Sequence, residues 1–110
     1  MERIFSYGTL QQEGVQLEIC GRILKGKKDT VKGFCVKNIE ITDEFALITS
    51  HEKIHPIIFF TGQPKHKVPG TVFEVTHDDL LKIDRYEVDE YKRVEVTLIS
   101  GKKSWIYKEK

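Results

Sequence analysis

The sequence has few cysteines, almost no net charge and no long hydrophobic run. Its two cysteines, Cys20 and Cys35, match neither the spacing of a redox motif nor that of a zinc site, so we expect two reduced, small apolar residues. Eighteen basic and seventeen acidic residues leave a net charge of +1. A charge this small creates no long-range field that would hold nucleic acid or an anionic membrane surface.

The hydrophobic residues are spread along the chain in short runs. None approaches the roughly twenty apolar residues that a membrane-spanning helix needs, and the N-terminus lacks the apolar core of a signal peptide. We therefore expect a cytoplasmic protein without a membrane partner. With 39% hydrophobic and 32% charged residues, the composition is typical of a folded globule. The length of 110 residues predicts a single domain, 1–110, which we expect to be a monomer, with a homodimer as the alternative.

Most of the sequence has the pattern of β-strands. Runs of β-branched and aromatic residues, separated by Gly, Pro and polar turns, predict strands at residues 3–7, 31–41, 45–50, 57–61, 71–75, 91–100 and 104–108. Apolar and polar residues alternate from Tyr91 onward, so one face of that strand is expected in the core. A hairpin turn at Gly101 follows. Residues 62–70 and the lysine-rich residues 24–28 are expected to be solvated loops.

Two helices are expected. The first runs from residue 10 to about residue 19 and ends at Gly21. The second begins at Thr76, which can cap it, and Asp79 can return a hydrogen bond to the amide of the cap. Many strands and few helices in a short chain predict an α+β fold. We expect a small mixed β-barrel, closed or nearly closed, of about six to seven strands flanked by two short helices.

Glu87 is the first candidate for acid or base chemistry. Counted along the second helix, Leu80, Ile83 and Glu87 stand at i, i+3 and i+7, so the apolar stripe that faces the core ends in a carboxylate. Loss of hydration there would raise the pKa of Glu87 toward neutral pH. Alternatively, Glu87 lies in a frayed last turn, reaches solvent and pairs with Arg93 or a neighbouring lysine. Asp84 borders the polar face, where a solvated or structural role is expected.

The turn after the first strand is the second candidate. Gly8 allows the chain to turn sharply, and the successive amides of Gly8, Thr9 and Leu10 can point together at an anion such as a substrate carboxylate. The alternative is an ordinary tight turn in which Thr9 caps the following helix. The four histidines are expected to be exposed in or beside loops, so no metal site is expected: His51, His55, His66 and His77.

These two stretches and two further motifs resemble the γ-glutamylcyclotransferase-like superfamily, which includes γ-glutamylamine cyclotransferases and the plant avirulence-induced-gene-2-like (AIG2-like) proteins. The motifs occur in the order typical of the family: Tyr7-Gly8-Thr9-Leu10, Gly70-Thr71-Val72-Phe73, Asp84-Arg85-Tyr86-Glu87 and Tyr91-Lys92-Arg93. The order of features matches over nearly the whole chain. The resemblance implies a compact β-barrel flanked by helices, with no metal and no organic cofactor.

The resemblance also implies a reaction. The free α-amino group of a γ-glutamyl peptide or γ-glutamylamine attacks its own γ-carbonyl, which releases the attached amine and leaves 5-oxoproline. Carried onto this sequence, Glu87 would be the general acid and base. The turn amides would hold the substrate's carboxyl end or the developing oxyanion, and the two tyrosine hydroxyls would orient the substrate. The implied substrate-binding residues are Tyr7, Gly8, Thr9, Leu10, Tyr91 and Arg93.

A second function class stays open beside this enzyme. The same cavity could bind a small carboxylate or amine without turnover, because a fold of this kind guarantees no catalysis. An RNA-binding barrel is disfavoured, since no clustered basic and aromatic face can be located. The expected partner is therefore a small-molecule γ-glutamyl substrate, whose leaving amine the sequence does not identify.

Overall fold

The computed structural model describes residues 1–44, 47–48, 53–87 and 90–110. Its strands are β1 (Glu2–Ser6), β2 (Gly26–Lys32), β3 (Phe34–Glu40), β4 (Ile54–Phe60), β5 (Lys67–Val75), β6 (Tyr91–Thr97) and β7 (Lys103–Glu109). Two α-helices, α1 (Glu13–Cys20) and α3 (His77–Tyr86), and a short 3₁₀ helix, η1 (Thr9–Gln11), lie wholly within those residues. The predicted α+β class is confirmed.

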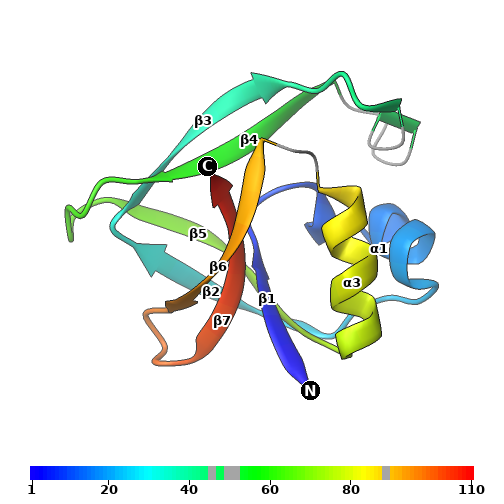
Figure 1. The fold of residues 1–110 in the computed structure, drawn as a ribbon. Helices are drawn as coiled ribbons and strands as arrows, with labels where there is room; N and C mark the ends of the chain where they lie inside the picture. Colours follow the sequence, from blue (N-terminus) through cyan, green and yellow to red (C-terminus); the bar gives the residue numbers. More distant parts are fainter. Residues whose placement is uncertain (45–46, 49–52, 88–89) are drawn as a thin grey trace.

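The strands of the described residues form two sheets. Five strands pair in the order β2-β5-β1-β7-β6, and β3 pairs with β4 alone. Strand β1 lies in the middle of the larger sheet, antiparallel to β5 and parallel to β7. In Figure 1 the two α-helices lie side by side at the right, and the β3–β4 hairpin crosses the top. The predicted hairpin at Gly101 joins β6 to β7, and Gly101 has a φ of 92° that favours glycine.

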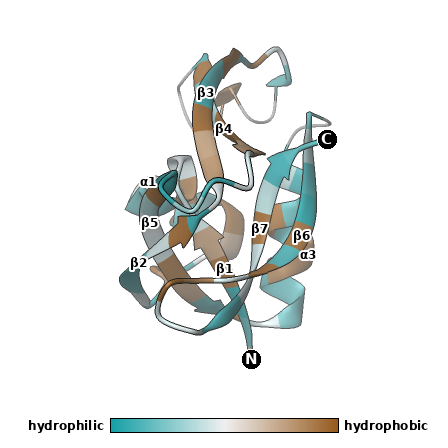
Figure 2. Cartoon of the chain, turned by 90° about the vertical axis from the view of Figure 1, so that its left-hand side faces the viewer, coloured by the Kyte–Doolittle hydropathy of each residue, from teal (hydrophilic) through white to brown (hydrophobic). Residues whose placement is uncertain are grey.

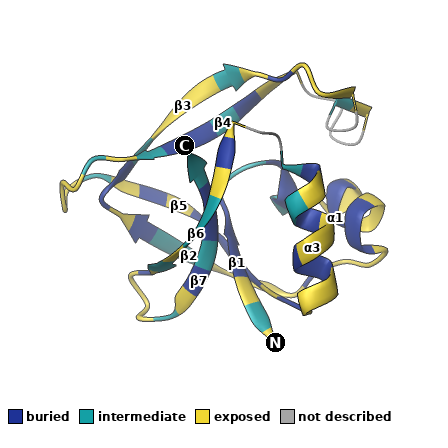
Figure 3. Ribbon diagram, viewed as in Figure 1, coloured by how far each residue is buried: buried dark blue, intermediate teal, exposed yellow. Residues whose placement is uncertain are grey.

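Both faces of the central strand are buried. Ile4 and Phe5 are neighbours in β1 whose side chains point to opposite faces, and their exposed fractions are 0% and 1%. Ile4 packs in a core with Leu80 and Ile83 of α3, while Phe5 packs in a second core on the other face. Figure 2 shows hydrophobic stretches along β1 and β4, and Figure 3 shows each helix with one buried and one exposed face. Burial on both faces explains why the apolar residues of β1 are adjacent rather than alternating.

The strands do not close into the predicted barrel. Within the described residues, β2 and β6 end the five-stranded sheet without pairing to each other. Strands β4 and β7 are bridged by the Tyr7 hydroxyl instead of by backbone hydrogen bonds between paired strands. This hydroxyl accepts a hydrogen bond from the Ile58 amide at 3.1 Å and donates one to the Tyr107 carbonyl at 2.6 Å. At the opposite edge, the Ile99 amide donates to the Thr30 carbonyl at 2.9 Å. These isolated hydrogen bonds stand where a closed barrel would need continuous strand pairing.

The predicted strand at residues 31–41 is in fact two strands. Gly33 lies between β2 and β3 with a φ of 87°, which interrupts an extended strand. At this residue the chain passes from the larger sheet to the smaller one. The lysine-rich residues 24–28, predicted to be a loop, lead into β2, and Lys27 and Lys28 are exposed on it. Exposed lysines are typical of an edge strand, because they oppose pairing with another chain.

Two further predictions concern the middle of the chain. Residues 62–70 are not a single loop, since Pro69 and Gly70 lie inside β5. Pro69 pairs only with β2, beyond the point where β1 ends at Ser6, so its missing amide hydrogen is tolerated. Most of the predicted strand at residues 45–50 lies outside the described residues. The two residues of this range that are described, Leu47 and Ile48, are helical.

Helix α1 ends at Gly21 as the sequence predicts, and Gly21 has a left-handed φ of 75°. The helix starts at Glu13 rather than at residue 10, because Thr9–Gln11 form the 3₁₀ helix η1. At the start of α3 the Thr76 hydroxyl accepts from the Asp79 amide at 3.0 Å, and the Asp79 carboxylate accepts from the Thr76 amide at 2.9 Å. This is the expected capping box. No helix in the described part of the chain is long and apolar enough to cross a membrane.

Candidate active site

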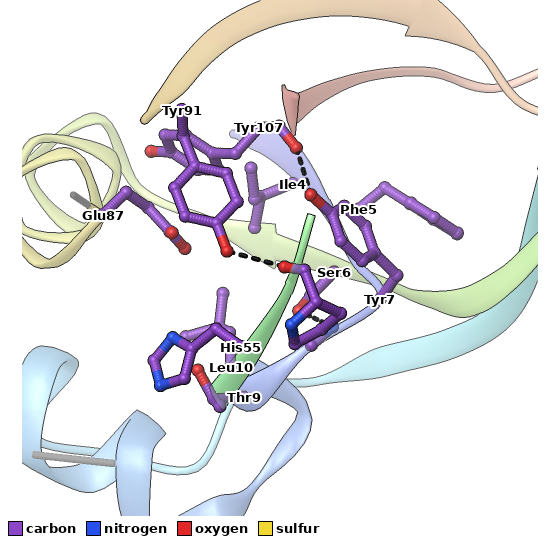
Figure 4. Close-up of a pocket in the computed structure, with 12 residues that line it drawn as sticks. Ile4, Phe5, Ser6, Tyr7, Thr9, Leu10, His55, Glu87, Tyr91 and Tyr107 are labelled. Atoms are coloured by element: carbon purple, nitrogen blue, oxygen red, sulfur yellow. Dashed lines mark hydrogen bonds between the residues drawn. The ribbon is translucent and has the colours of Figure 1, made fainter. Parts of the chain in front are cut away.

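A cavity of about 380 Å³, counted with its open mouth, lies beside the turn that follows β1. Its wall comes from this turn, from β4, β6 and β7, and from the end of α3 (Figure 4). The lining residues are Ile4, Phe5, Ser6, Tyr7, Gly8, Thr9, Leu10, His55, Pro56, Glu87, Tyr91 and Tyr107. The turn and the carboxylate, which are far apart in the sequence, therefore share one cavity.

The turn brings backbone amides to the cavity wall. Gly8 approaches β4 so closely that a Cβ atom would lie 3.1 Å from the Pro56 Cγ atom. The Gly8 amide donates to the Ser6 hydroxyl at 3.3 Å, so it is already engaged. Within the described residues, the amides of Thr9 and Leu10 have no acceptor. Two of the three predicted amide donors are thus available to an anion.

The side chains around the turn fasten it to both helices. No side chain caps η1, so the alternative in which Thr9 caps the helix is wrong. Instead, the Thr9 hydroxyl lies 2.6 Å from the Tyr86 hydroxyl in the last turn of α3. From α1, the Gln16 side-chain amide donates to the Leu10 carbonyl at 2.8 Å. These buried hydrogen bonds hold the turn amides in a fixed place.

Glu87 follows α3 directly, and its amide donates to the Ile83 carbonyl at 3.0 Å. Figure 4 shows the carboxylate directed into the cavity toward the Tyr91 ring. Among the described residues, this carboxylate has no hydrogen-bond partner. Burial and, to a smaller extent, the negative charge of Asp84 raise the pKa of Glu87 to about 8. The structure thus places an acid with a near-neutral pKa where helical counting expects it, and the alternative pairing with Arg93 does not occur.

Three tyrosines of the wall use their hydroxyl protons within the protein. Tyr7 donates to the Tyr107 carbonyl and Tyr91 to the Pro56 carbonyl, each at 2.6 Å, while Tyr107 donates to the Asp84 carboxylate. Burial raises the pKa of all three hydroxyls, so they stay neutral. Tyr7 also accepts a hydrogen bond from the Ile58 amide, whereas the Tyr91 hydroxyl accepts none among the described residues and keeps its oxygen lone pairs for a substrate donor. The two predicted substrate tyrosines therefore differ in what they can offer.

Tyr7→Phe is expected to lower the free energy of unfolding by about 2 kcal/mol. The substitution deprives the Ile58 amide and the Tyr107 carbonyl of their shared partner, whereas the matched control Tyr91→Phe deprives only the Pro56 carbonyl. Urea unfolding of both variants measures the difference. A smaller loss for Tyr7→Phe than for Tyr91→Phe would contradict the bridging role of Tyr7.

Arg93 does not line the cavity. Its Nε atom lies 2.9 Å and a terminal nitrogen 3.1 Å from the two Asp84 carboxylate oxygens. The guanidinium carbon also lies 4.4 Å from the centroid of the Trp105 ring. The predicted contact of Arg93 with substrate therefore has no support in its position. Asp84 has the structural role that the sequence analysis expects.

His55 is a wall residue that the sequence analysis missed. It was expected to be exposed, but its exposed fraction is 4%, so that prediction is wrong. A signal was present, because His55 stands two residues before Ile57, a core residue of β4, and alternation puts both on one face. Tyr107 was also missed as a wall residue. Its face on β7 follows from alternation, but nothing in the sequence shows that Glu87 comes to that face.

His66 and His77 do not line this cavity. His77 is exposed as predicted and lies 2.9 Å from the Glu2 carboxylate. His66 is half-buried, 2.9 Å from the Thr61 hydroxyl, and His51 lies outside the described residues. Within the ranges that the structure describes, no group of three or more His, Cys, Asp or Glu residues could hold a metal ion.

Several solved structures have the same fold. A protein from Arabidopsis thaliana, solved in solution, is 20% identical with a TM-score of 0.74 over 98% of this chain and 61% of its own. A second solution structure from Arabidopsis thaliana is 24% identical with a TM-score of 0.71 over 98% and 68%. A protein named gamma-glutamyl cyclotransferase is 18% identical with a TM-score of 0.72 over 99% and 66%. At these identities the likeness shows the fold, and the chain spans about three fifths of the first relative's length.

The sequence itself matches a protein family. No match was found among the curated proteins. In contrast, the profile of the family described as Gamma-glutamyl cyclotransferase, AIG2-like matches residues 4–109. The match includes every residue of the cavity wall and all the elements of the fold except the first two residues of β1. This protein therefore belongs to the AIG2-like gamma-glutamyl cyclotransferase family.

Proposed function

We propose that this protein is a γ-glutamylcyclotransferase that releases 5-oxoproline and a free amine from a γ-glutamyl peptide or γ-glutamylamine. The observation that carries the proposal is the Glu87 carboxyl, which lies in a cavity and has a pKa of about 8. The two unpaired amides of the turn line the same cavity. Family membership supports the class of reaction.

The basicity of Glu87 suits the first proton transfer. The α-ammonium of the substrate must lose a proton before its nitrogen can attack. An α-amino group ordinarily titrates near ~8, so a carboxylate with a pKa of about 8 takes this proton at little cost. For a glutamate carboxylate at its ordinary pKa of 4.5, the same proton transfer would cost roughly 5 kcal/mol more. The bound ammonium also favours the ionised form of Glu87, since opposite charges attract at short range.

One side chain can then move the proton through the whole reaction. The α-nitrogen forms a bond to the γ-carbon, and the carbonyl oxygen takes up the negative charge of a tetrahedral intermediate. Glu87 returns its proton to the departing nitrogen as the original carbon–nitrogen bond breaks. The ring nitrogen still carries a second proton, which Glu87 takes and the released amine accepts. Two protons thus pass from the α-ammonium to the released amine, and the reaction balances without any co-reactant.

The turn supplies the positioning. The amides of Thr9 and Leu10 can hold the substrate's carboxylate or stabilise the oxyanion as it develops. The Tyr91 oxygen can accept a hydrogen bond from the substrate ammonium. Since the ring closes within one molecule, holding the γ-glutamyl chain in a folded pose supplies much of the acceleration.

The wild-type protein is expected to release 5-oxoproline from at least one compound in a panel of γ-glutamyl dipeptides, γ-glutamylamines and γ-glutamyl isopeptides. Its kcat/KM should rise between about pH 6 and pH 8, because Glu87 gains its ionised form as the pH approaches the pKa of about 8. Chromatography of 5-oxoproline gives the rates. A blank without protein at each pH corrects for spontaneous cyclisation.

Two outcomes would change the assignment. If no compound is converted but one binds tightly, the protein is a ligand-binding member of the family rather than an enzyme. If 5-oxoproline is released at a rate that does not depend on pH over this range, Glu87 is not the base.

A further inference from the structure

Asp84 connects the cavity acid to a cation behind the cavity wall. It is a residue of α3 that lies three residues before Glu87, the residue at which that helix ends, and its negative charge acts on the Glu87 carboxyl. Its oxygens accept from Arg93 Nε at 2.9 Å, from a terminal Arg93 nitrogen at 3.1 Å and from the Tyr107 hydroxyl. A carboxylate held by the forked donors of an arginine is fixed in orientation and compensated in charge.

Arg93 is held from its other side as well. Its guanidinium lies over the Trp105 ring, and the Trp105 indole donates to the Glu2 carboxylate at 3.0 Å. The side chains of Arg93 and Asp84 are 24% and 32% exposed. Because most of this ion pair is shielded from water, its charges are screened less than those of an open surface pair.

We propose that Arg93 is a positioning residue, which holds Asp84 and offsets the negative charge that Asp84 places beside Glu87. The inference rests on the proposed role of Glu87 as general acid and base. Without the guanidinium, the Asp84 carboxylate would disfavour the ionised form of Glu87 more strongly. Without Asp84, that ionised form would be favoured. The two partners of one ion pair therefore act on Glu87 in opposite directions.

Other titratable groups also surround Glu87. Besides Asp84 and Arg93, they are Tyr7 in the turn after β1, His55 of β4, Tyr86 of α3, Tyr91 of β6 and Tyr107 of β7. The hydroxyls of Tyr7, Tyr91 and Tyr107 stay neutral, because burial raises the pKa of each. A histidine ordinarily titrates close to neutral pH, so His55 could obscure an activity profile. The test must therefore observe Glu87 itself.

The experiment is an NMR titration of the Glu87 carboxyl carbon in the full chain. Arg93→Gln is expected to move the midpoint to higher pH, and Asp84→Asn to lower pH. In the Asp84→Asn background, adding Arg93→Gln should have no further effect, because Arg93 acts through Asp84. The pH profile of kcat/KM should move with the midpoint, and a displacement of about half a pH unit changes kcat/KM about threefold on the sloping limb.

Two further variants control for charge and folding. Arg85→Gln removes a cation next to Asp84 that is exposed and has no ion-pair partner among the described residues, and it should leave the midpoint unchanged. Arg93→Lys keeps the positive charge, so it should restore most of the wild-type midpoint even if Arg93→Gln folds poorly. A midpoint in Arg93→Gln equal to that of the wild type, or shifts of the same sign in both single variants, would overturn the inference.

The titration needs no turnover, which separates this inference from the proposed function. Opposite shifts in a chain that releases no 5-oxoproline would establish the action of Arg93 on Glu87 and reject the enzymatic role. If turnover depended on Glu87 but the Glu87 midpoint did not move in Arg93→Gln, the enzymatic role would stand and the action of Arg93 on Glu87 would be rejected.

Discussion

Glu87→Gln is expected to lower kcat for 5-oxoproline release by about 10²-fold to 10⁴-fold. Glutamine has nearly the same shape, but it can neither take the proton from the α-ammonium nor return it to the departing amine. The variant should fold, because the Glu87 carboxyl has no hydrogen-bond partner among the described residues that the substitution would strand. Substrate binding, measured by calorimetry, should persist, since the turn amides are unchanged.

The stability of the same variant gives an independent check. Glu87 has a folded pKa of about 8 against an ordinary value of 4.5, so the folded state keeps a proton that the unfolded state loses. Wild-type stability should therefore fall as the pH rises from 4.5 to about 8. Glu87→Gln should lack this contribution. Urea unfolding at the two ends of the window measures it.

Glu18→Gln is a matched control for both measurements. Glu18 is exposed on α1, outside the cavity, so this variant should keep the wild-type rate and pH dependence. If Glu87→Gln released 5-oxoproline as fast as Glu18→Gln does, Glu87 would not be the general acid and base.

Gly70→Ala is expected to lower the free energy of unfolding by about 3 kcal/mol or more. A Cβ atom at this position of β5 would lie 2.4 Å from the Ser6 carbonyl oxygen and 2.7 Å from the Phe5 Cζ atom. Backbone cannot move aside as a flexible side chain can, so β1 and β5 must separate. Because Ser6 ends β1, the displacement would reach the turn that carries the Thr9 and Leu10 amides. Turnover should fall together with stability.

Gly14→Ala makes the same chemical change where there is room. A Cβ atom there would meet nothing within 4 Å. Gly14 lies inside α1, where alanine favours the helix by about 1 kcal/mol over glycine, so this variant should be more stable than the wild type. Urea unfolding of both variants compares them. If Gly70→Ala and Gly14→Ala changed the free energy of unfolding by the same amount, crowding at Gly70 would not be the cause.

The parts of the fold that depend on neighbours in sequence could be predicted. The Thr76 and Asp79 capping box and the Gly21 helix end are formed by residues within one turn of each other. The hairpin at Gly101 is equally local. The barrel prediction was wrong because closure depends on how distant strands meet. The Tyr7 hydroxyl takes the place of strand pairing between β4 and β7, and no local pattern announces it.

The same division holds for the site. Helical counting placed Glu87 on the inward stripe, and the structure confirms its position in the cavity. The count could not say which groups would surround the carboxylate. His55 stands before the strand predicted at residues 57–61, so the sequence predicts an exposed residue beside a loop. The family resemblance implies a contact of Arg93 with substrate, whereas in the structure its guanidinium lies over the Trp105 ring and contacts Asp84.

The sequence by itself determined the end of α1, the start of α3, most of the strands, the inward position of Glu87 and the likeness to the family, since each depends on spacing along the chain. Only the tertiary structure decided that the Glu87 carboxylate and the Thr9 and Leu10 amides share a cavity. It also decided that the pKa of this carboxyl is about 8. The physical reason is that hydration and charge at a side chain depend on what folding brings around it, and here those groups come from β1, β4, β6 and β7.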